Sequence, residues 1–381
     1  MTARSPARGS PALLAICATL SGLFALAMLH RWEVSPLGLK SYGRVWFYYV
    51  SYTDFGFTRR CLLGTLMTIS RANALTSNAY VFAYIVHSIA VLVLVALIAG
   101  IFLRNRPQAH PLLLLVTFFS PSFIVQAGYN TGSLDIYLLI VMVLCTFYAR
   151  STVAFTIGLV IGSLIHELFI FTIPSLMLLR MIRLQESGAD RRGALRQLVV
   201  PAAAVGVTIA CLRIWGRAEL PMQIYQAMVA AKIPAAAYQH PFWSGWYEVA
   251  GTFSDLFKYA RGLPANMRVS PAWVFMLAYL GILVSLQFIQ ARRDGVYRLL
   301  ALSTLTPLLA CVIAGDFYRW IGMSCSLALL SLLCLVLREG EKFPMRAYLW
   351  LLPFSLLAPF GTADPAVPYP LIQLVLQRLG A

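Results

Sequence analysis

The sequence predicts an all-α fold, a polytopic bundle of transmembrane helices, and three observations lead to this expectation. Of 381 residues, 60% are hydrophobic and 12% are charged, with a mean hydropathy of +0.76, whereas soluble domains carry roughly 25% charged residues. Long apolar runs approach the roughly 20 residues that a helix needs to cross a bilayer, without the period-two alternation of a barrel. Short arginine clusters separate the runs and mark the ends of spans. We expect about 10 to 11 spans in one integral membrane domain over residues 1–381.

The first half of the chain indicates four spans, with a long outer segment after the first. The run Ala12–Leu29 is followed by His30 and Arg31, not by a small-residue cleavage site. We therefore interpret it as an uncleaved first span with a cytoplasmic N-terminus. Residues 31–77 then form an outer segment, in which Cys61–Ser70 is apolar but too short to cross and is expected to lie at the interface. The next spans are Ala79–Leu103, Pro111–Gln126 and Leu134–Tyr148.

Residues 152–180 form an apolar stretch that fits either one tilted helix or two short arms. Arg150 precedes the stretch, a second arginine cluster starts at Arg180, and His166 and Glu167 interrupt the middle. If both clusters are cytoplasmic, the stretch must enter the membrane and return, with arms of only about 14 residues. We therefore expect two arms, with His166 and Glu167 toward the outer face.

The second half adds another long outer loop, residues 213–270, after the span Leu198–Leu212. Its aromatic residues, among them Trp243 and Trp246, suggest further interfacial helices. The expected location is a bacterial inner (plasma) membrane. The later spans are Ala272–Ile289, Leu299–Ala314, Trp320–Leu337 and Ala347–Phe360, and a proline-rich outer tail follows.

Composition also bounds the partners and cofactors. The formal net charge of +16 comes mostly from arginines at helix ends, which argues against nucleic acid and favours membrane lipids or a phosphate-bearing lipid as the partner. The seven cysteines form no CxxC pair, so we expect no disulfide framework and no thiolate metal site. The five histidines are dispersed, and Ile170 stands where an HExxH zinc motif starting at His166 would need its second histidine. No metal and no other cofactor is expected.

The densest charged cluster follows the first span, in residues 52–60. It combines Asp54 with Arg59 and Arg60 on the outer side, where basic residues are usually scarce. Because guanidinium groups match phosphate oxygens in a two-pronged fashion, the arginines are candidate phosphate ligands, and Asp54 is a candidate catalytic base. The alternative is an ion pair between Asp54 and Arg59 or Arg60 that only fixes the loop.

Two further segments bring polar groups to the same face. In the turn between two spans, Asn130 and Asp135 are candidates for binding sugar hydroxyls, or alternatively for capping the next helix. His166 and Glu167 lie in otherwise apolar sequence and are candidates for acid–base catalysis. The alternative for them is a mutually satisfied polar pair that fixes helix packing.

The fourth charged segment opens a late span. Asp316 and Arg319 stand three residues apart, so they share one helix face. We interpret Asp316 as a candidate catalytic carboxylate and Arg319 as a candidate substrate ligand, with an interfacial ion pair as the alternative. Four separate segments thus carry charge to one face, which predicts a single polar site beneath the two long outer loops.

The acidic residue in the first outer loop, the long outer loops and the many spans resemble the GT-C class of membrane glycosyltransferases. This resemblance implies a polyprenyl-phosphate sugar donor on the non-cytoplasmic face, with Asp54 as the base, although a single aspartate stands here where that class usually has paired acidic residues. His166, and Asp316 with Arg319, are similar to EpsG- or Wzy-type polysaccharide polymerases. Either family implies sugar transfer from a lipid-linked donor to a glycan or lipid acceptor in envelope polysaccharide or glycolipid assembly.

Two other functions fit the same pattern. In a transporter or lipid flippase, intramembrane charges mark the substrate pathway, and in a non-catalytic assembly subunit they have a structural role. Transporters often have internal repeats and midplane sites in broken helices. The sequence shows no repeat and its charges gather at one face, which favours the glycosyltransferase.

Overall fold

The structure is a computed structural model that describes residues 11–33, 45–75, 79–105, 111–121, 123, 134–218, 220–233, 272–290, 295–312, 317–339 and 345–357. Its elements are all helical. Those of the first half are α1 (Pro11–Glu33), η1 (Val45–Tyr48), α2 (Tyr52–Phe55), α3 (Leu62–Ile69), η2 (Ala72–Ala74), α4 (Ala79–Arg104), α5 (Pro111–Phe118), α7 (Asp135–Val143), the π-helical η5 (Leu144–Tyr148) and α8 (Thr152–Ile165). Those of the second half are η6 (Glu167–Thr172), α9 (Ile173–Glu186), α10 (Arg191–Ile214), α11 (Met222–Lys232), α15 (Ala272–Gln290), α16 (Gly295–Ser303), η8 (Thr306–Val312), α17 (Phe317–Glu339), η10 (Met345–Trp350) and α18 (Leu352–Leu357).

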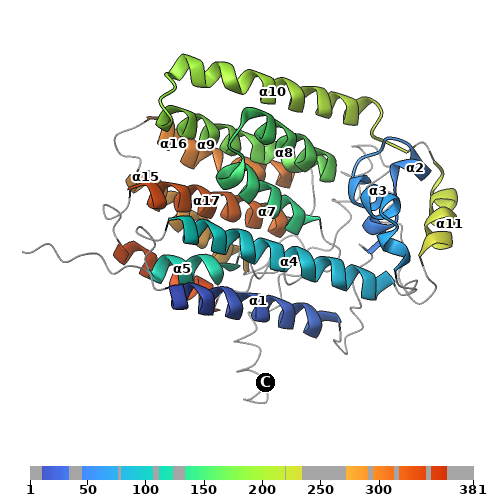
Figure 1. The fold of residues 1–381 in the computed structure, drawn as a ribbon, viewed down its shortest axis with the longest axis horizontal. Helices are drawn as coiled ribbons and strands as arrows, with labels where there is room; N and C mark the ends of the chain where they lie inside the picture. The colour runs from blue at the N-terminus through green and yellow to red at the C-terminus, as the bar shows by residue number, and fades with distance from the viewer. Residues whose placement is uncertain are drawn as a thin grey trace, which may run out of the picture.

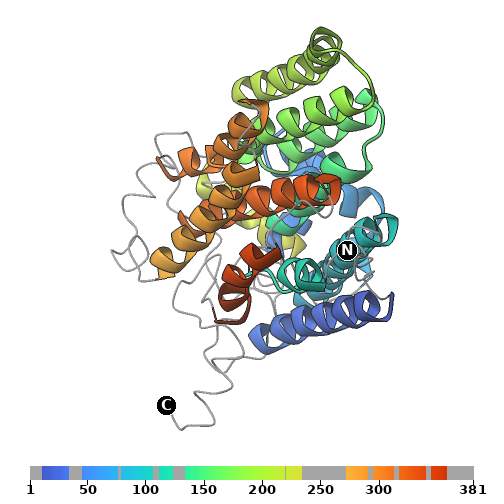
Figure 2. The same cartoon turned by 90° about the vertical axis from the view of Figure 1, so that its left-hand side faces the viewer.

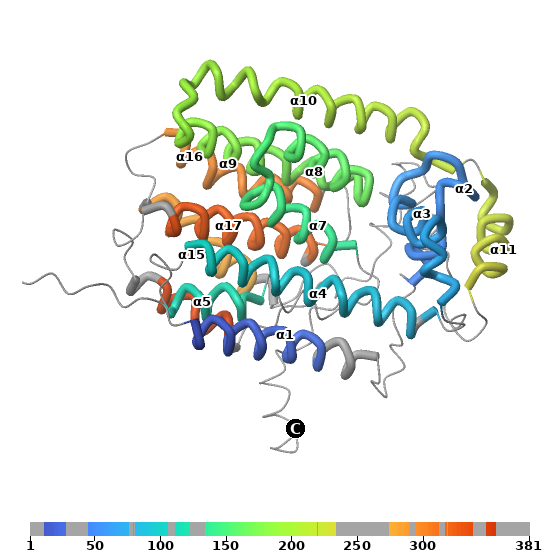
Figure 3. Tube along the Cα trace, in the orientation of Figure 1, coloured from blue at the N-terminus to red at the C-terminus, as the bar shows by residue number. Residues whose placement is uncertain are grey.

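The long helices lie side by side in one bundle (Figure 1). Helices α1 and α10 form opposite sides of the bundle, and Figure 2 shows the same arrangement from the side. The short helices α2, α3 and α11 gather at one end, where α3 and α11 run across the direction of the long helices (Figure 3). The short helix expected at Cys61–Ser70 is therefore confirmed as α3, and it belongs to a cap at one end of the bundle.

Three of the described helices are long and apolar enough to cross a membrane, namely α4 over Val81–Arg104, α10 over Arg191–Ile214 and α17 over Arg319–Leu337. Helices α17 and α10 differ in burial. Nearly every residue of α17 is buried, whereas α10 exposes apolar side chains such as Val199, Val200 and Val207. A helix that is apolar on all sides belongs in an interior or in lipid. Helix α17 is thus the central helix of the bundle, and α10 presents an apolar outer surface.

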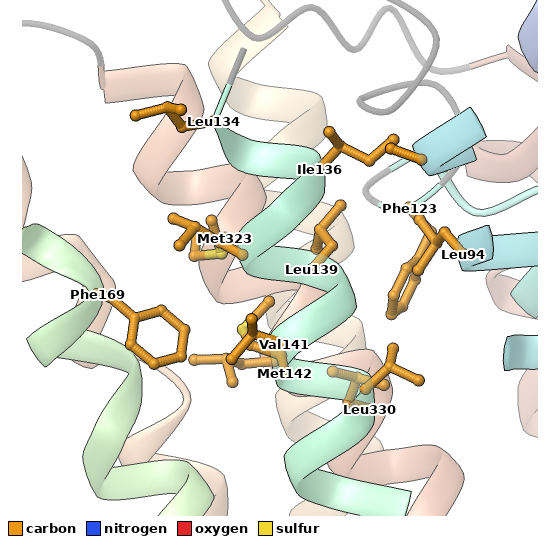
Figure 4. Close-up of a cluster of buried hydrophobic side chains, with 14 of the residues drawn as sticks. Leu94, Phe123, Leu134, Ile136, Leu139, Val141, Met142, Phe169, Met323 and Leu330 are labelled. Atoms are coloured by element: carbon orange, nitrogen blue, oxygen red, sulfur yellow. The ribbon is translucent and has the colours of Figure 1, made fainter. Parts of the chain in front are cut away.

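The core surrounds α7, whose side chains meet those of α4, η6 and α17 (Figure 4). Leu139 and Met142 of α7 lie in one buried cluster with Met323 and Leu330 of α17 and Phe169 of η6. All five side chains are essentially inaccessible to solvent. Apolar packing of this kind fixes the helices relative to one another, so it also fixes the ends of α7, η6 and α17, where charged residues stand.

The chain between residues 152 and 180 forms two arms. Helix α8 ends at Ile165, η6 follows, and α9 begins at Ile173. The guanidinium of Arg180 in α9 donates hydrogen bonds of 2.9 Å to the carbonyl oxygens of Ala149 and Arg150, directly before α8. The end of α9 therefore lies beside the start of α8. The expectation of two arms is confirmed, and His166 and Glu167 occupy the bend far from these arginines.

The expectation of unbroken helices is wrong in three places, and a proline explains each. Helix α5 ends at Phe118, before Pro121, instead of continuing to Gln126. The expected span Leu299–Ala314 is divided into α16 and η8 near Pro307, and the expected span Ala347–Phe360 is divided into η10 and α18 near Pro353. Proline lacks the backbone N–H that continues a helix, and its ring also disfavours helical backbone in the preceding residue.

Candidate functional site

The loop between α2 and α3 carries two arginines into the end of the bundle. Arg59 and Arg60 are only 9% and 6% exposed. The backbone N–H of Arg59 donates a 2.9 Å hydrogen bond to the carbonyl oxygen of Gly216, just after α10. Arg60 adopts left-handed backbone with φ of 64°, which costs a non-glycine residue about 1–2 kcal/mol. The contacts around Arg60 therefore stabilise a backbone conformation that is unfavourable for arginine in the absence of those contacts.

The Arg60 guanidinium forms a two-pronged ion pair with Glu167 at the α8–η6 bend. Its Nε atom donates to Oε2 at 3.0 Å and its Nη2 atom donates to Oε1 at 2.6 Å. Burial alone would raise the pKa of the Glu167 carboxyl, but the charge of Arg60, with smaller effects from His166 and Arg59, holds that pKa well below its usual range. Glu167 lies in η6, outside the long apolar helices. It is therefore a carboxylate that stays ionised.

His166 extends the cluster toward α17. Its Nδ1 atom accepts a 3.2 Å hydrogen bond from the N–H of Leu168 and lies 3.5 Å from Oε2 of Glu167. Accepting through Nδ1 leaves the proton of a neutral imidazole on Nε2. The imidazole meets the indole of Trp320 edge-on, with 5.6 Å between ring centroids. The Arg319 guanidinium lies over the same indole, 5.5 Å from its centroid, so Trp320 connects His166 to Arg319.

Arg319 forms the second buried ion pair of the site. Its Nε atom donates to Oδ1 of Asp135 at 2.5 Å, and the two side chains are 6% and 2% exposed. Asp135 is the first residue of α7, where the helix dipole favours a negative charge. This ion pair joins the starts of α7 and α17, two elements that also pack together in the core.

The four segments thus form one continuous cluster, from Arg60 through Glu167, His166 and Trp320 to Arg319 and Asp135. It contains three guanidiniums, counting that of Arg59, and the carboxylates of Glu167 and Asp135. Because these side chains are less than a fifth exposed, the guanidiniums stand in surroundings of low polarity. Hydrogen bonds from them to an anion are stronger there than in water.

Asp54 lies next to this cluster with partners of its own. Its carboxylate accepts a short hydrogen bond from the hydroxyl of Ser51 and forms a close ion pair with Lys232 at the end of α11. The expected pairing of Asp54 with Arg59 or Arg60 is not what the structure shows, because Glu167 binds Arg60 instead. Asp54 remains 20% exposed, which is more than either carboxylate in the buried cluster.

Among the residues expected from the sequence, the structure thus brings Arg59, Arg60, Glu167 and His166 together and links Arg319 with Asp135. Asp135 was a candidate for binding sugar hydroxyls, but in the structure its carboxylate forms an ion pair with Arg319. The remaining two, Asn130 and Asp316, lie outside the described residues. Sequence reasoning missed Lys232, whose only signal was its place as the single cation between Arg217 and Lys258 in the second outer loop.

The chemistry of the cluster suits anions better than metal ions. In the described part of the chain, no group of three or more His, Cys, Asp or Glu side chains is arranged to hold a metal. The carboxylates of Glu167 and Asp135 are bound by guanidiniums. Guanidinium groups recognise phosphate and carboxylate oxygens through paired N–H donors, so a phosphate group is the ligand that this set of residues fits.

Gly64 holds α3, and with it the arginine loop, against η1. A β-carbon at this position would overlap the carbonyl oxygens of Val50 and Phe47, which belong to the backbone. We expect Gly64→Ala to lower stability by about 1–3 kcal/mol, despite the higher helix propensity of alanine. Thermal unfolding of the purified protein in detergent measures this change.

The matched control is Gly206→Ala in α10, where a β-carbon would meet no atom within 4 Å. This variant should be as stable as the wild type or slightly more stable, because alanine favours a helix by up to about 1 kcal/mol. Equal unfolding temperatures for the two variants would contradict the close packing of α3 on η1.

Comparison of this chain with protein-family models, with curated proteins and with solved structures found no match. The functional conclusions below therefore rest on the residues and geometry of this chain.

Proposed function

We propose that this chain is a polytopic membrane glycosyltransferase that transfers or polymerises sugars from a polyprenyl phosphate or diphosphate donor on the non-cytoplasmic face. In this proposal about 10 to 11 helices span a bacterial inner membrane, and the N-terminus is cytoplasmic. The observation that supports it is the meeting of charged residues from four separate segments at one end of the bundle, beneath the cap of α2, α3 and α11.

The arginines supply what a lipid phosphate leaving group requires. When the bond between the anomeric carbon and the phosphate oxygen breaks, the phosphate takes the electron pair and its negative charge increases. Positive groups fixed in a site of low polarity stabilise such charge more strongly than water does. Arg59 and Arg60 are the first candidates for this role, since they enter the site together on one loop and are almost fully buried there.

A general base must remove the proton of the acceptor hydroxyl as its oxygen attacks the anomeric carbon. Glu167 is a weak candidate for this role, because its lowered pKa and its two bonds to Arg60 make it a poor proton acceptor. Asp54 is the better base, since it is more exposed and adjoins the arginine loop. In this assignment Lys232 positions the Asp54 carboxylate, and His166 and Glu167 position Arg60.

The test is glycan profiling in a strain that lacks this chain and is complemented with variants. Asp54→Asn should lower the transferred sugar by roughly 10²–10⁴-fold, the usual effect of losing a general base, with normal amounts of folded protein. Asp190→Asn is the matched control, because Asp190 caps α10 far from the site through its bond to the N–H of Gly193, and asparagine caps equally well.

Two results would overturn the proposal. A wild-type glycan profile from well-expressed Asp54→Asn would remove this residue from the mechanism. Substrate-dependent transport by the purified chain in proteoliposomes, without sugar transfer, would assign the charged cluster to a transport pathway instead.

A further inference from the structure

The opposite end of the bundle contains a second cluster of arginines, which the proposed reaction does not use. Arg180 and Arg183 stand in the last turns of α9, and their guanidiniums donate to carbonyl oxygens at the end of the α7–η5 helix and just beyond it. Arg183 donates to Thr146, and Arg180 donates to Ala149 and Arg150. These carbonyls have no partner within their own helix, so the two arginines cap that helix end.

Two more arginines surround the same helix end and are exposed. The guanidinium of Arg104, the last residue of α4, lies over the ring of Tyr148, 4.6 Å from its centroid. Arg150 follows η5 directly, and among the described residues its side chain makes no hydrogen bond or ion pair. Four guanidiniums thus gather at one helix end, two fixed by carbonyls and two facing outward.

In the part of the chain that the structure describes, this cluster carries more positive than negative charge. The ion pairs found there join other side chains, and Glu186, the carboxylate one turn beyond Arg183, balances at most one of the four guanidinium charges. Arg180 is only 6% exposed. Four like charges close together repel one another, and a buried charge without an opposite partner is costly. An anion bound between Arg104 and Arg150 would reduce the repulsion among the four guanidiniums and would place an opposite charge near the buried Arg180.

The surface beside the arginines indicates which kind of anion. Helix α7 lies between α4 and α8, which both contact it. On α8, Val153, Ile157 and Ile161 are exposed and recur every four residues, so they form one apolar stripe that starts next to Arg150. Leu103 is exposed beside Arg104 on α4. A ligand with a negative head and apolar chains fits this surface, whereas a free phosphate ion would use only the arginines.

We propose that Arg104, Arg150, Arg180 and Arg183 bind the phosphate of an anionic phospholipid, whose acyl chains lie along the exposed apolar residues of α8 and α4. Arg180 and Arg183 form the fixed base of the site, and Arg104 and Arg150 close around the headgroup. Clusters of basic residues at the ends of membrane helices attract anionic lipids in this way. The inference does not depend on the proposed sugar transfer, because none of these residues belongs to the other cluster.

The experiment measures lipid binding to the full-length protein in detergent, by native mass spectrometry and by the unfolding temperature. Phosphatidylglycerol should bind and raise the unfolding temperature, phosphatidylcholine should do neither, and inorganic phosphate should bind much more weakly. The double variant Arg104→Gln with Arg150→Gln should bind phosphatidylglycerol about tenfold less tightly or worse. It should keep its fold, because Arg180 and Arg183 still cap the carbonyls.

Arg191→Gln with Arg192→Gln is the matched control. It removes the same charge from exposed positions at the start of α10, outside the cluster, and should bind phosphatidylglycerol as the wild type does. Equal losses in the two double variants would show only general attraction of negative lipid, and equal binding of phosphatidylcholine or of inorganic phosphate would exclude an anionic phospholipid site. Each of these results would overturn the proposal.

Discussion

Removing either partner of the Asp135–Arg319 ion pair is expected to destabilise the folded chain by about 3–5 kcal/mol. Both side chains are almost fully buried, and the pair joins the starts of α7 and α17. Asp135→Leu leaves the Arg319 guanidinium buried without this carboxylate, and Arg319→Met leaves the carboxylate without this guanidinium. Because the remaining charge has lost its solvation and its partner, the cost exceeds that of a lost surface ion pair, which is at most about 1 kcal/mol.

A variant with both residues replaced distinguishes the stability that the ion pair contributes from the free-energy cost of burying one charge alone. Asp135→Leu with Arg319→Met should be much more stable than the sum of the single changes implies, because an apolar pair often replaces a buried ion pair at little cost. Thermal unfolding in detergent measures all four proteins, and Arg192→Gln on the exposed start of α10 should change stability by less than about 0.5 kcal/mol. Additive losses in the double variant would contradict a direct ion pair.

The positions of the helices could be predicted well because they depend on local sequence. The apolar runs expected at Ala79–Leu103, Leu134–Tyr148 and Ala272–Ile289 correspond to α4, to α7 with η5, and to α15. The length of an apolar run and the arginines at its ends are visible in a short window. The breaks near Pro121, Pro307 and Pro353 are also predictable from local sequence, because proline lacks the backbone N–H that a continuous helix needs. The apolar runs continue past these prolines, so hydropathy alone does not reveal the breaks.

The ion pairs could not be predicted in the same way, because their partners are far apart in the chain. For the arginine loop, the sequence suggested an ion pair between neighbours, Asp54 with Arg59 or Arg60, as the alternative to a catalytic role. The structure instead pairs Arg60 with a residue 107 positions away, and it joins Arg319 to a residue 184 positions away. Which charges meet depends on how the helices pack, and no local pattern encodes that packing. The types of residue in the site were predictable, but their pairing was not.

Exchanging the charges of the Arg60–Glu167 pair is expected to separate folding from function. Glu167→Gln removes the carboxylate that binds the buried Arg60 guanidinium and should destabilise the chain by roughly 3–5 kcal/mol. Arg60→Glu combined with Glu167→Arg restores an ion pair between the arginine loop and the α8–η6 bend, so it should recover part of that loss. Sugar transfer should stay low in the exchanged protein, because the guanidinium no longer stands on the loop beside Arg59 and Asp54.

The pH dependence of stability tests the same pair without relying on activity. Arg60 holds the pKa of Glu167 in the folded chain below the unfolded value of about 4.3. The stabilisation is therefore fully present above that pH and is lost as the pH falls toward the folded-state pKa. The difference in unfolding temperature between the wild type and Glu167→Gln should be largest near neutral pH and should shrink below about pH 4. A difference in unfolding temperature that stays constant down to about pH 4 would mean that the pair contributes no stabilising charge. A wild-type glycan profile from the exchanged protein would mean that the proposed mechanism does not need the Arg60 guanidinium on its loop.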